Sequence, residues 1–188
     1  MRKIVLYPNK ILRVVTPEII KVTSGLKKEI SDLSLILKKG DNAAGLAAPQ
    51  IGLNKRFFGT KEIGDGGIRI FINPKIEKNF GEMVFPMLVE NDIEDDFWEG
   101  CLSFPDYFGT VKRYLKIKVS WQVLQSRNNS DFELVKKEAI FEGFEAIVFQ
   151  HELDHLNGIV FTDHVKEDKG KFCKMIGKEM IKVDLSKF

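Results

Sequence analysis

The first regular pattern in the chain is a helical stripe of apolar residues. Leu26, Ile30, Leu33 and Leu37 recur at i, i+4, i+7 and i+11. This spacing places all four side chains on one face of an α-helix. Gly40 follows at a position suited to end that helix. The pattern therefore predicts an N-terminal helix over residues 26–37.

Two later segments carry the same periodicity. The second covers residues 142–157 and is followed by Gly158 as a stop, and its shared face carries Phe144, Ile147, Val148, His151 and His155. The third covers residues 168–182, with Phe172, Ile176 and Met180 along one side. We therefore predict a central helix that carries two histidines and a C-terminal helix.

Between the first two predicted helices the pattern changes to that of strands. Residues 115–123 alternate between apolar and polar side chains, as a half-buried strand does. A turn at residues 128–131 would fold residues 132–141 back as the hairpin partner. Residues 68–73 and 80–89 are further strand candidates. Because strands cluster between helices, an α+β fold is predicted, with antiparallel β-sheets around the central helix.

Composition narrows the class of protein. The chain has 188 residues, 44% of them hydrophobic and 30% charged, which suits a single globular domain over residues 1–188. The net charge is only +2 and the basic residues are spread along the chain, so the composition does not require a nucleic-acid partner. We find no signal peptide and no apolar run long enough to cross a membrane. We therefore expect a cytoplasmic protein with Cys101 and Cys173 reduced.

The motif that carries chemistry is His-Glu-x-x-His on the predicted central helix. His151 and His155 are two of only three histidines in the chain. Residues four apart on a helix are neighbours, so both imidazoles can bind one cation. Glu152 lies about 100° around the helix from His151, where it is suited to act as a general base rather than as a ligand.

A catalytic metal site needs a third protein ligand. Phe161 stands where a further histidine would be needed for a metzincin. Glu167, Asp168 and Glu179 are downstream carboxylates, of which Glu179 is conceivable, whereas His164 is expected on a strand or turn after the helix. Upstream, Cys101 follows a glycine in a predicted strand-to-turn segment, and a thiolate is a strong ligand for such a cation. Cys101 is therefore our preferred third ligand.

Three motifs together resemble the peptide deformylase family. They are GLAAPQ at residues 45–50, EGCLS at residues 99–103 and QHELDH at residues 150–155. They occur in the order found in that family, and the resemblance extends over about residues 4–165. It implies a metal-dependent amide hydrolase that removes the formyl group from the N-terminal formyl-methionine of new polypeptides and releases formate.

The resemblance also implies roles for individual residues. Cys101, His151 and His155 would hold one divalent metal ion, with Fe²⁺ favoured as the physiological metal and Zn²⁺ or Ni²⁺ as forms of the purified protein. Glu152 would act as general base and then as proton donor. The Gln50 side chain and the Leu102 backbone N–H would stabilise the developing oxyanion.

A further set of residues is expected around the substrate. Glu99 is interpreted as a structural residue that orients the site, and Gly45 is expected to let the substrate backbone approach closely. Two positions depart from the family pattern: Ala43 replaces a frequent glycine, and Phe108 replaces a substrate-binding arginine. The full set of residues predicted around the substrate is Ala44, Gly45, Phe97, Glu99, Gly100, Phe144, Ile147 and Val148.

Two other interpretations remain open at this point. A zinc endopeptidase would share the His-Glu-x-x-His motif but cleave internal peptide bonds. A structural metal site or peptide-binding module would need no general base, so Glu152 argues against it. The expected partners are N-formylmethionyl nascent peptides. The lysine-rich run at residues 166–182 leaves the ribosome open as a partner, although a solvated helix face is preferred.

Overall fold

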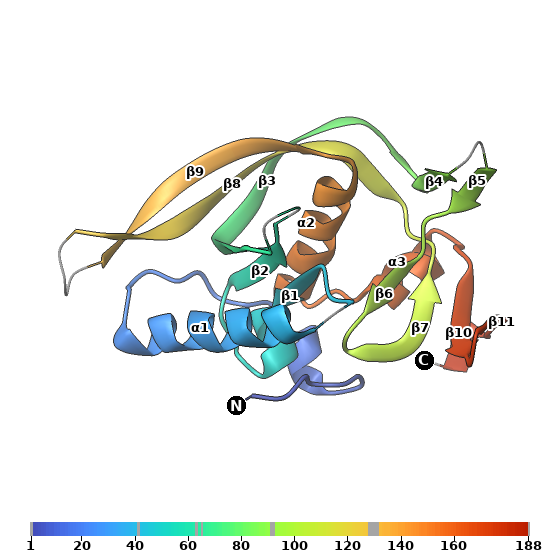
Figure 1. The fold of residues 1–188 in the computed structure, drawn as a ribbon, viewed down its shortest axis with the longest axis horizontal. Helices are drawn as coiled ribbons and strands as arrows, with labels where there is room; N and C mark the ends of the chain where they lie inside the picture. The colour runs from blue at the N-terminus through green and yellow to red at the C-terminus, as the bar shows by residue number, and fades with distance from the viewer. Residues whose placement is uncertain are drawn as a thin grey trace.

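The computed structural model describes residues 2–40, 42–62, 64, 66–90, 93–127 and 132–187. Figure 1 shows an α+β arrangement in which antiparallel strands surround a central helix. The predicted fold class is therefore confirmed. The described helices are α1 (Ser24–Lys39), α2 (Gly143–Leu156) and α3 (Phe161–Glu167), with short 3-10 turns at Lys10–Arg13, Ala48–Ile51 and Leu185–Lys187.

The larger sheet has five strands in the order β1-β2-β3-β8-β9. Every neighbouring pair in it is antiparallel, and β8 and β9 form the predicted hairpin, with Val119 opposite Ala139. The predicted turn at residues 128–131 lies outside the described residues. The strand bounds are β1 (Gly45–Ala47), β2 (Phe57–Lys61), β3 (Ile68–Val84), β8 (Arg113–Ser126) and β9 (Phe132–Glu142).

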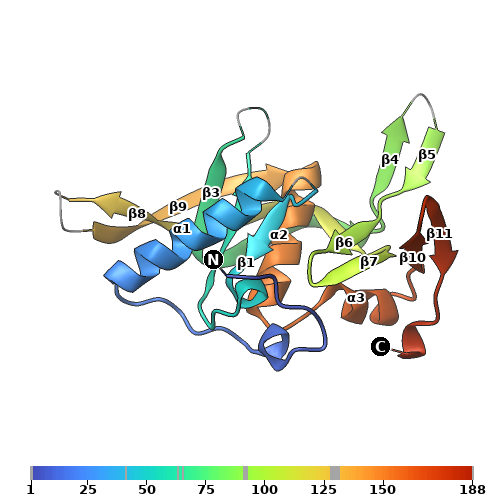
Figure 2. The same ribbon diagram turned by 60° about the horizontal axis from the view of Figure 1, so that its bottom comes forward.

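A second sheet of four strands lies at the other end of the molecule, in the order β11-β10-β7-β6. A separate hairpin of β4 and β5 stands out from the body beside it (Figure 2). The candidate strand at residues 80–89 is thus divided between the end of β3 and β4. The bounds are β4 (Met87–Glu90), β5 (Ile93–Asp96), β6 (Glu99–Cys101), β7 (Phe104–Gly109), β10 (Phe172–Ile176) and β11 (Glu179–Lys182).

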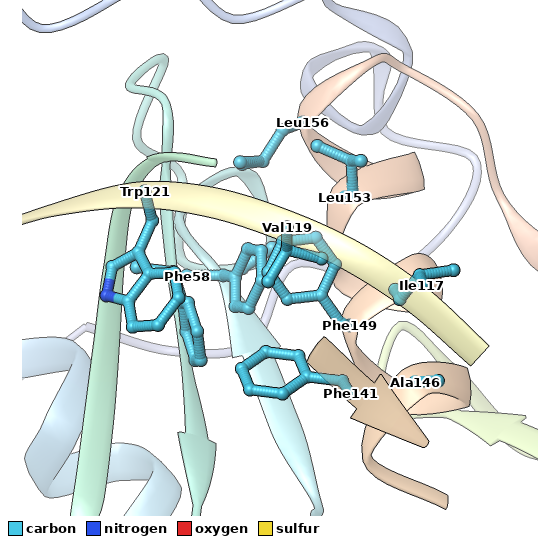
Figure 3. Packing of buried hydrophobic residues seen from close by; sticks show 11 residues of the cluster. Phe58, Ile117, Val119, Trp121, Phe141, Ala146, Phe149, Leu153 and Leu156 are labelled. Atoms are coloured by element: carbon cyan, nitrogen blue, oxygen red, sulfur yellow. The ribbon is translucent and has the colours of Figure 1, made fainter. Parts of the chain in front are cut away.

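Helix α2 lies against the concave face of the large sheet, and aromatic side chains fill the space between them (Figure 3). Phe149 of α2 meets Phe58 and Phe71 edge-on, with ring centroids 5.2 and 5.4 Å apart. Phe141 closes the cluster at 5.6 Å from Phe149. Edge-to-face packing of buried rings contributes specific geometry as well as buried area. This cluster fixes the position of the helix that carries the histidines.

Helix α1 covers the opposite side of the strands β1 and β2. Its N-terminus is capped by Thr23, whose hydroxyl accepts the backbone N–H of Leu26 at 3.1 Å. The predicted stripe is on the inner face, since Leu26, Leu33 and Leu37 are all buried. A side chain at Gly59 of β2 would lie 2.9 Å from the end of Leu33, so the helix sits directly on the strand. Gly40 is the C-terminal cap, as predicted.

The predicted C-terminal helix over residues 168–182 is wrong. Residues 172–182 of this segment instead form the β10–β11 hairpin, in which Ile176 is opposite Glu179. Gly177, with φ of +63°, occupies the two-residue turn between the strands. The third helix of the fold is α3, and it begins earlier, at Phe161. His164, which we expected on a strand or turn, lies on that helix.

Two leucines of α1 provide a matched test of this packing. We expect Leu33→Ala to lower the free energy of unfolding by about 2–5 kcal/mol, because Leu33 is fully buried and a cavity would remain. Leu35→Ala should change it by less than about 0.5 kcal/mol, since Leu35 is 45% exposed. Urea denaturation of both variants measures the difference. Equal effects would contradict the assigned face of α1.

Candidate metal centre

The two motif histidines project from the same face of α2. Their ring centroids are 5.1 Å apart, and the rings are inclined at 78°. The rest of α2 is held in the aromatic core by Phe149 and Leu153, which are both buried. The histidines therefore have little freedom to move apart. His155 is 1% exposed and lies deeper than His151.

Cys101 brings a thiol to the histidine pair from the end of β6. Its Sγ atom is 3.3 Å from Nε2 of His155. One ligand atom each from Cys101, His151 and His155 all lie within 4.8 Å of one another. Among the described residues, no other set of side chains forms such a cluster. The thiol is free rather than in a disulfide, as is that of Cys173.

This donor set fits a first-row divalent cation. Tetrahedral bonds of about 2.3 Å to sulfur and about 2.0–2.1 Å to nitrogen place those two atoms about 3.5 Å apart. The observed separation of 3.3 Å between Cys101 Sγ and His155 Nε2 is close to that value. Three protein ligands leave a fourth position open, as in catalytic rather than structural sites. The Cys101 prediction is therefore supported over a downstream ligand, and Glu179 lies exposed on β11.

The thiol is prepared for ligation by its neighbours. Burial alone would raise the pKa of Cys101, but the nearby His155 and His151 outweigh it and lower that pKa to about 5. A thiolate is the form that binds metals. Gln50 adds a donor on the same side, because its Nε2 lies 3.4 Å from Cys101 Sγ. Its Oε1 accepts the Ala47 backbone N–H at 2.8 Å, which orients the amide.

Glu99 supports His151 from behind. The buried Glu99 carboxylate accepts a hydrogen bond from Nδ1 of His151 at 2.8 Å, which leaves Nε2 for a metal. Arg113 donates two further bonds to Glu99, of 2.7 and 2.9 Å. Burial opposes the charge of Glu99, but Arg113 and His151 prevail and lower its pKa to about 2. The structural role predicted for Glu99 agrees with this geometry.

Arg113, Asp154 and His164 extend this support, a role that the sequence did not suggest for them. Arg113 also donates to Asp154 Oδ2 at 2.6 Å, and the same oxygen lies 2.9 Å from Nε2 of His164. Burial raises the pKa of Asp154, but Arg113 and His164 outweigh it and the pKa is lowered. Asp154 lies in the motif itself, yet only the fold shows that Arg113 and His164 converge on it. The result is a buried ionic network behind the metal ligands.

Glu152 is the one motif carboxylate that is left without a strong partner. Its Oε2 atom is buried and has no hydrogen-bond partner within the described part of the chain. Burial raises the pKa of Glu152 to about 7, despite the opposing effect of His151 and His155. Such an environment suits a group that exchanges protons near neutral pH.

A cavity of about 540 Å³ opens beside these groups. Leu102, which follows Cys101 in the turn, lines it together with Gln50 and Glu152. Phe108 packs its ring over Gly100, where an added Cβ would lie 2.8 Å from the ring, so it fills space rather than offering a charge. All of the predicted substrate-contacting residues line this cavity, namely Ala44, Gly45, Phe97, Glu99, Gly100, Phe144, Ile147 and Val148.

Comparisons with known proteins agree with this geometry. A sequence profile of the polypeptide deformylase family matches residues 1–171. The chain belongs to the peptide deformylase family. A peptide deformylase of Leptospira biflexa is 35% identical over 184 residues, which are 90% of each chain. One from Aquifex aeolicus is 37% identical over 170 residues, or 88% of each chain.

Solved structures of family members have the same fold. The crystal structure of peptide deformylase from Thermotoga maritima superposes with a TM-score of 0.69 at 35% identity, over 87% of this chain and 97% of that one. A plant peptide deformylase, PDF1B, gives a TM-score of 0.71 at 30% identity, over 89% and 86% of the two chains. The family is one of metal-dependent hydrolases, and the Cys/His/His site of this chain is typical of it.

The support of His151 by Glu99 can be tested with a matched pair of variants. We expect Glu99→Gln to weaken metal binding about 10–100-fold, because the carboxylate that orients His151 and balances Arg113 is lost. Glu62→Gln removes a carboxylate that pairs with Arg69 at 2.9 Å outside the site, and should leave the affinity unchanged. Competition with a chromogenic chelator measures both. Equal affinities in the two variants would contradict the role of Glu99.

Proposed function

We propose that the chain hydrolyses the N-formyl group of formyl-methionine at the start of new polypeptides and releases formate. The observation that carries this proposal is the buried, unpartnered carboxylate oxygen of Glu152 beside the Cys/His/His cluster of the described residues. A formate-release assay on a short formyl-Met peptide tests it directly. Absence of formate from the metal-loaded protein would refute it.

Cys101, His151 and His155 would hold the metal ion. When bound, a divalent cation supplies Lewis-acid activation of water and of a carbonyl oxygen. We propose Fe²⁺ as the physiological metal, with Zn²⁺ or Ni²⁺ able to occupy the purified protein. Thiolate and imidazole ligands accept all three, so the donor set is compatible with this proposal.

Glu152 would move the proton in the reaction. A carboxylate whose pKa is about 7 can take a proton from the attacking water and return it to the leaving amine. Its free Oε2 atom has no competing hydrogen bond within the described residues. The new N-terminal amine and formate are then the two products.

Gly45 leaves the space that Glu152 occupies. A Cβ atom at Gly45 would lie 2.4 Å from Oε1 of Glu152 and 2.8 Å from its Cδ. Real Cβ atoms do not approach other atoms so closely, so the carboxyl would have to move. From the sequence, the need for glycine was attributed to the substrate backbone. The contact with Glu152 adds a second reason that the sequence alone did not show.

The remaining groups of the cavity would bind the formyl oxygen and the methionine side chain. The Gln50 amide points toward Cys101 Sγ, and together with the Leu102 backbone N–H it would stabilise negative charge on the formyl oxygen. The methionine side chain would lie among apolar residues of the same cavity, namely Ala44, Phe97, Phe144, Ile147 and Val148. Glu99 and Gly100 would form the wall next to Cys101.

Two other functions fit the site less well. In a structural metal site a general base has no use, and an unpartnered buried carboxylate such as Glu152 would only cost stability. A zinc endopeptidase remains distinguishable by assay, because it would cleave an internal bond of an unformylated peptide and release no formate. Family membership favours formate release.

The cellular setting is also a proposal. We propose that the chain acts as one catalytic domain, residues 1–188, in the cytoplasm, on nascent peptides. Its relatives include a chloroplastic peptide deformylase of Solanum lycopersicum, so family membership does not fix the compartment. None of the helices in the described ranges has the length and apolarity needed to cross a bilayer. A contact with the ribosome would be made by the lysine-rich segment at residues 166–182.

The role of Glu152 can be separated from metal binding by one substitution. We expect Glu152→Gln to keep its metal, because the substitution replaces no ligand, while kcat falls about 10²–10⁴-fold through loss of the proton acceptor. Metal analysis and formate release on the same sample measure both quantities. A variant that turned over at the parental rate would show that another group is the base.

The space at Gly45 gives a second prediction. We expect Gly45→Ala to keep its metal and to lower kcat at least about tenfold, since the added methyl displaces the Glu152 carboxyl. Gly25→Ala on α1 is the control and should leave kcat unchanged, because its added Cβ would lie 3.6 Å from the Thr23 hydroxyl, an ordinary contact outside the site. If Gly45→Ala lowered metal content but not kcat per bound metal, the steric account of Gly45 would fail.

A further inference from the structure

A second cavity, of about 340 Å³, lies beside the N-terminal half of α2. The proposed hydrolysis of formyl-methionine makes no use of it. Strands β2, β3 and β9 and helix α2 contribute its walls. Its lining residues away from the metal centre include Thr60, Arg69, Phe71, Phe141, Glu145 and Phe149.

Three side chains separate this second cavity from the one at the metal centre. Ala44, Phe144 and Val148 line both cavities. Phe144 and Val148 are four residues apart on α2, so they lie on one face of the helix. Ile147 lines only the cavity at the metal centre, and Phe149 lines only the second one. The partition is therefore one row of side chains thick.

The partition is thinnest at Ala44, because the side chain of that residue is only a methyl group. The Ala44 carbonyl accepts the Lys61 N–H at 2.9 Å, so the backbone at this point is fixed by β2. Phe144 is 48% exposed and touches Phe97 edge-on, with centroids 6.0 Å apart. Part of the Phe144 ring therefore faces solvent rather than core, and a larger side chain at position 44 would narrow the space between the two cavities.

The interior of the second cavity is suited to apolar groups. Phe71, Phe141 and Phe149 form its floor, and their rings meet edge-to-face at 5.4 to 5.9 Å. The charged groups that line it already have partners: Arg69 donates to Glu145 at 2.6 Å and to Glu62 at 2.9 Å, and the Lys61 ammonium donates to the Gly40 carbonyl. An ionic ligand would have to displace these pairs, whereas an alkyl chain would not.

We propose that a linear apolar side chain longer than methionine passes over Ala44, between Phe144 and Val148, into this second cavity. The inference rests on the proposed function, because the side chain in question is that of the formylated first residue. It assigns Ala44 as the residue whose small side chain leaves the second cavity open to long side chains. Linear chains are accepted up to the depth of both cavities, and side chains branched near the backbone are rejected at the partition.

The test compares three tripeptides that differ only in the formylated first residue: methionine, 2-aminodecanoic acid and cyclohexylalanine. Formate release gives kcat/KM for each with the metal-loaded protein. We expect the 2-aminodecanoyl peptide to lie within about tenfold of the methionyl peptide, and the cyclohexylalanyl peptide to be at least about a hundredfold slower. Ala44→Ile should lower the ratio of 2-aminodecanoyl to methionyl kcat/KM at least about tenfold.

Val148→Ala widens the same partition and should change that ratio in the opposite direction. Ala44→Val replaces Ala44→Ile if circular dichroism shows that the larger residue prevents folding. Hydrolysis of the methionyl peptide with poor use of the long chain, or a ratio that Ala44→Ile does not alter, would overturn this inference and leave the proposed function standing. No formate from any of the peptides would instead refute the proposed function.

Discussion

The site depends on the close approach of strand β6 to helix α2. Two contacts define it: Cys101 Sγ lies 3.3 Å from His155 Nε2, and Glu99 accepts from His151 Nδ1 at 2.8 Å. Both come from one short strand. Arg113, buried at the start of β8, links that strand to α2 because it forms ion pairs with both Glu99 on β6 and Asp154 on α2. Removing one partner of such a buried pair is costly, so the network resists separation of the two elements.

Local patterns predicted much of the fold and failed where partners are distant in sequence. The apolar residues of α1 predicted a helix correctly, because their spacing of four, three and four residues fits one face of a helix and not one face of a strand. In the C-terminal segment, Phe172, Ile176 and Met180 are spaced by four, a separation that suits a helix but also places residues on one face of a strand. The segment forms a hairpin because β10 pairs with β7, in which Cys173 is opposite Phe108. The local spacing of apolar residues does not show that the segment will pair with a strand so far away in the sequence.

In the site, too, local patterns were predictable from the sequence and contacts between distant segments were not. The motif placed His151 and His155 together by helical spacing alone, and chemistry supplied the preference for Cys101. The sequence could not show that His164 reaches Asp154, since α3 has to turn back against α2 for that contact. Nor could it show that Gly45 touches Glu152, because β1 and α2 are far apart along the chain and only the packed core brings them together.

The chemistry proposed for this chain requires one sulfur and two imidazole nitrogens to hold a single cation. X-ray absorption spectroscopy of the zinc-loaded protein measures that coordination directly. We expect one sulfur at about 2.3 Å and two nitrogens at about 2.0–2.1 Å, with the sulfur signal lost in Cys101→Ser. A first coordination sphere of nitrogen and oxygen alone in the parent protein would contradict this arrangement.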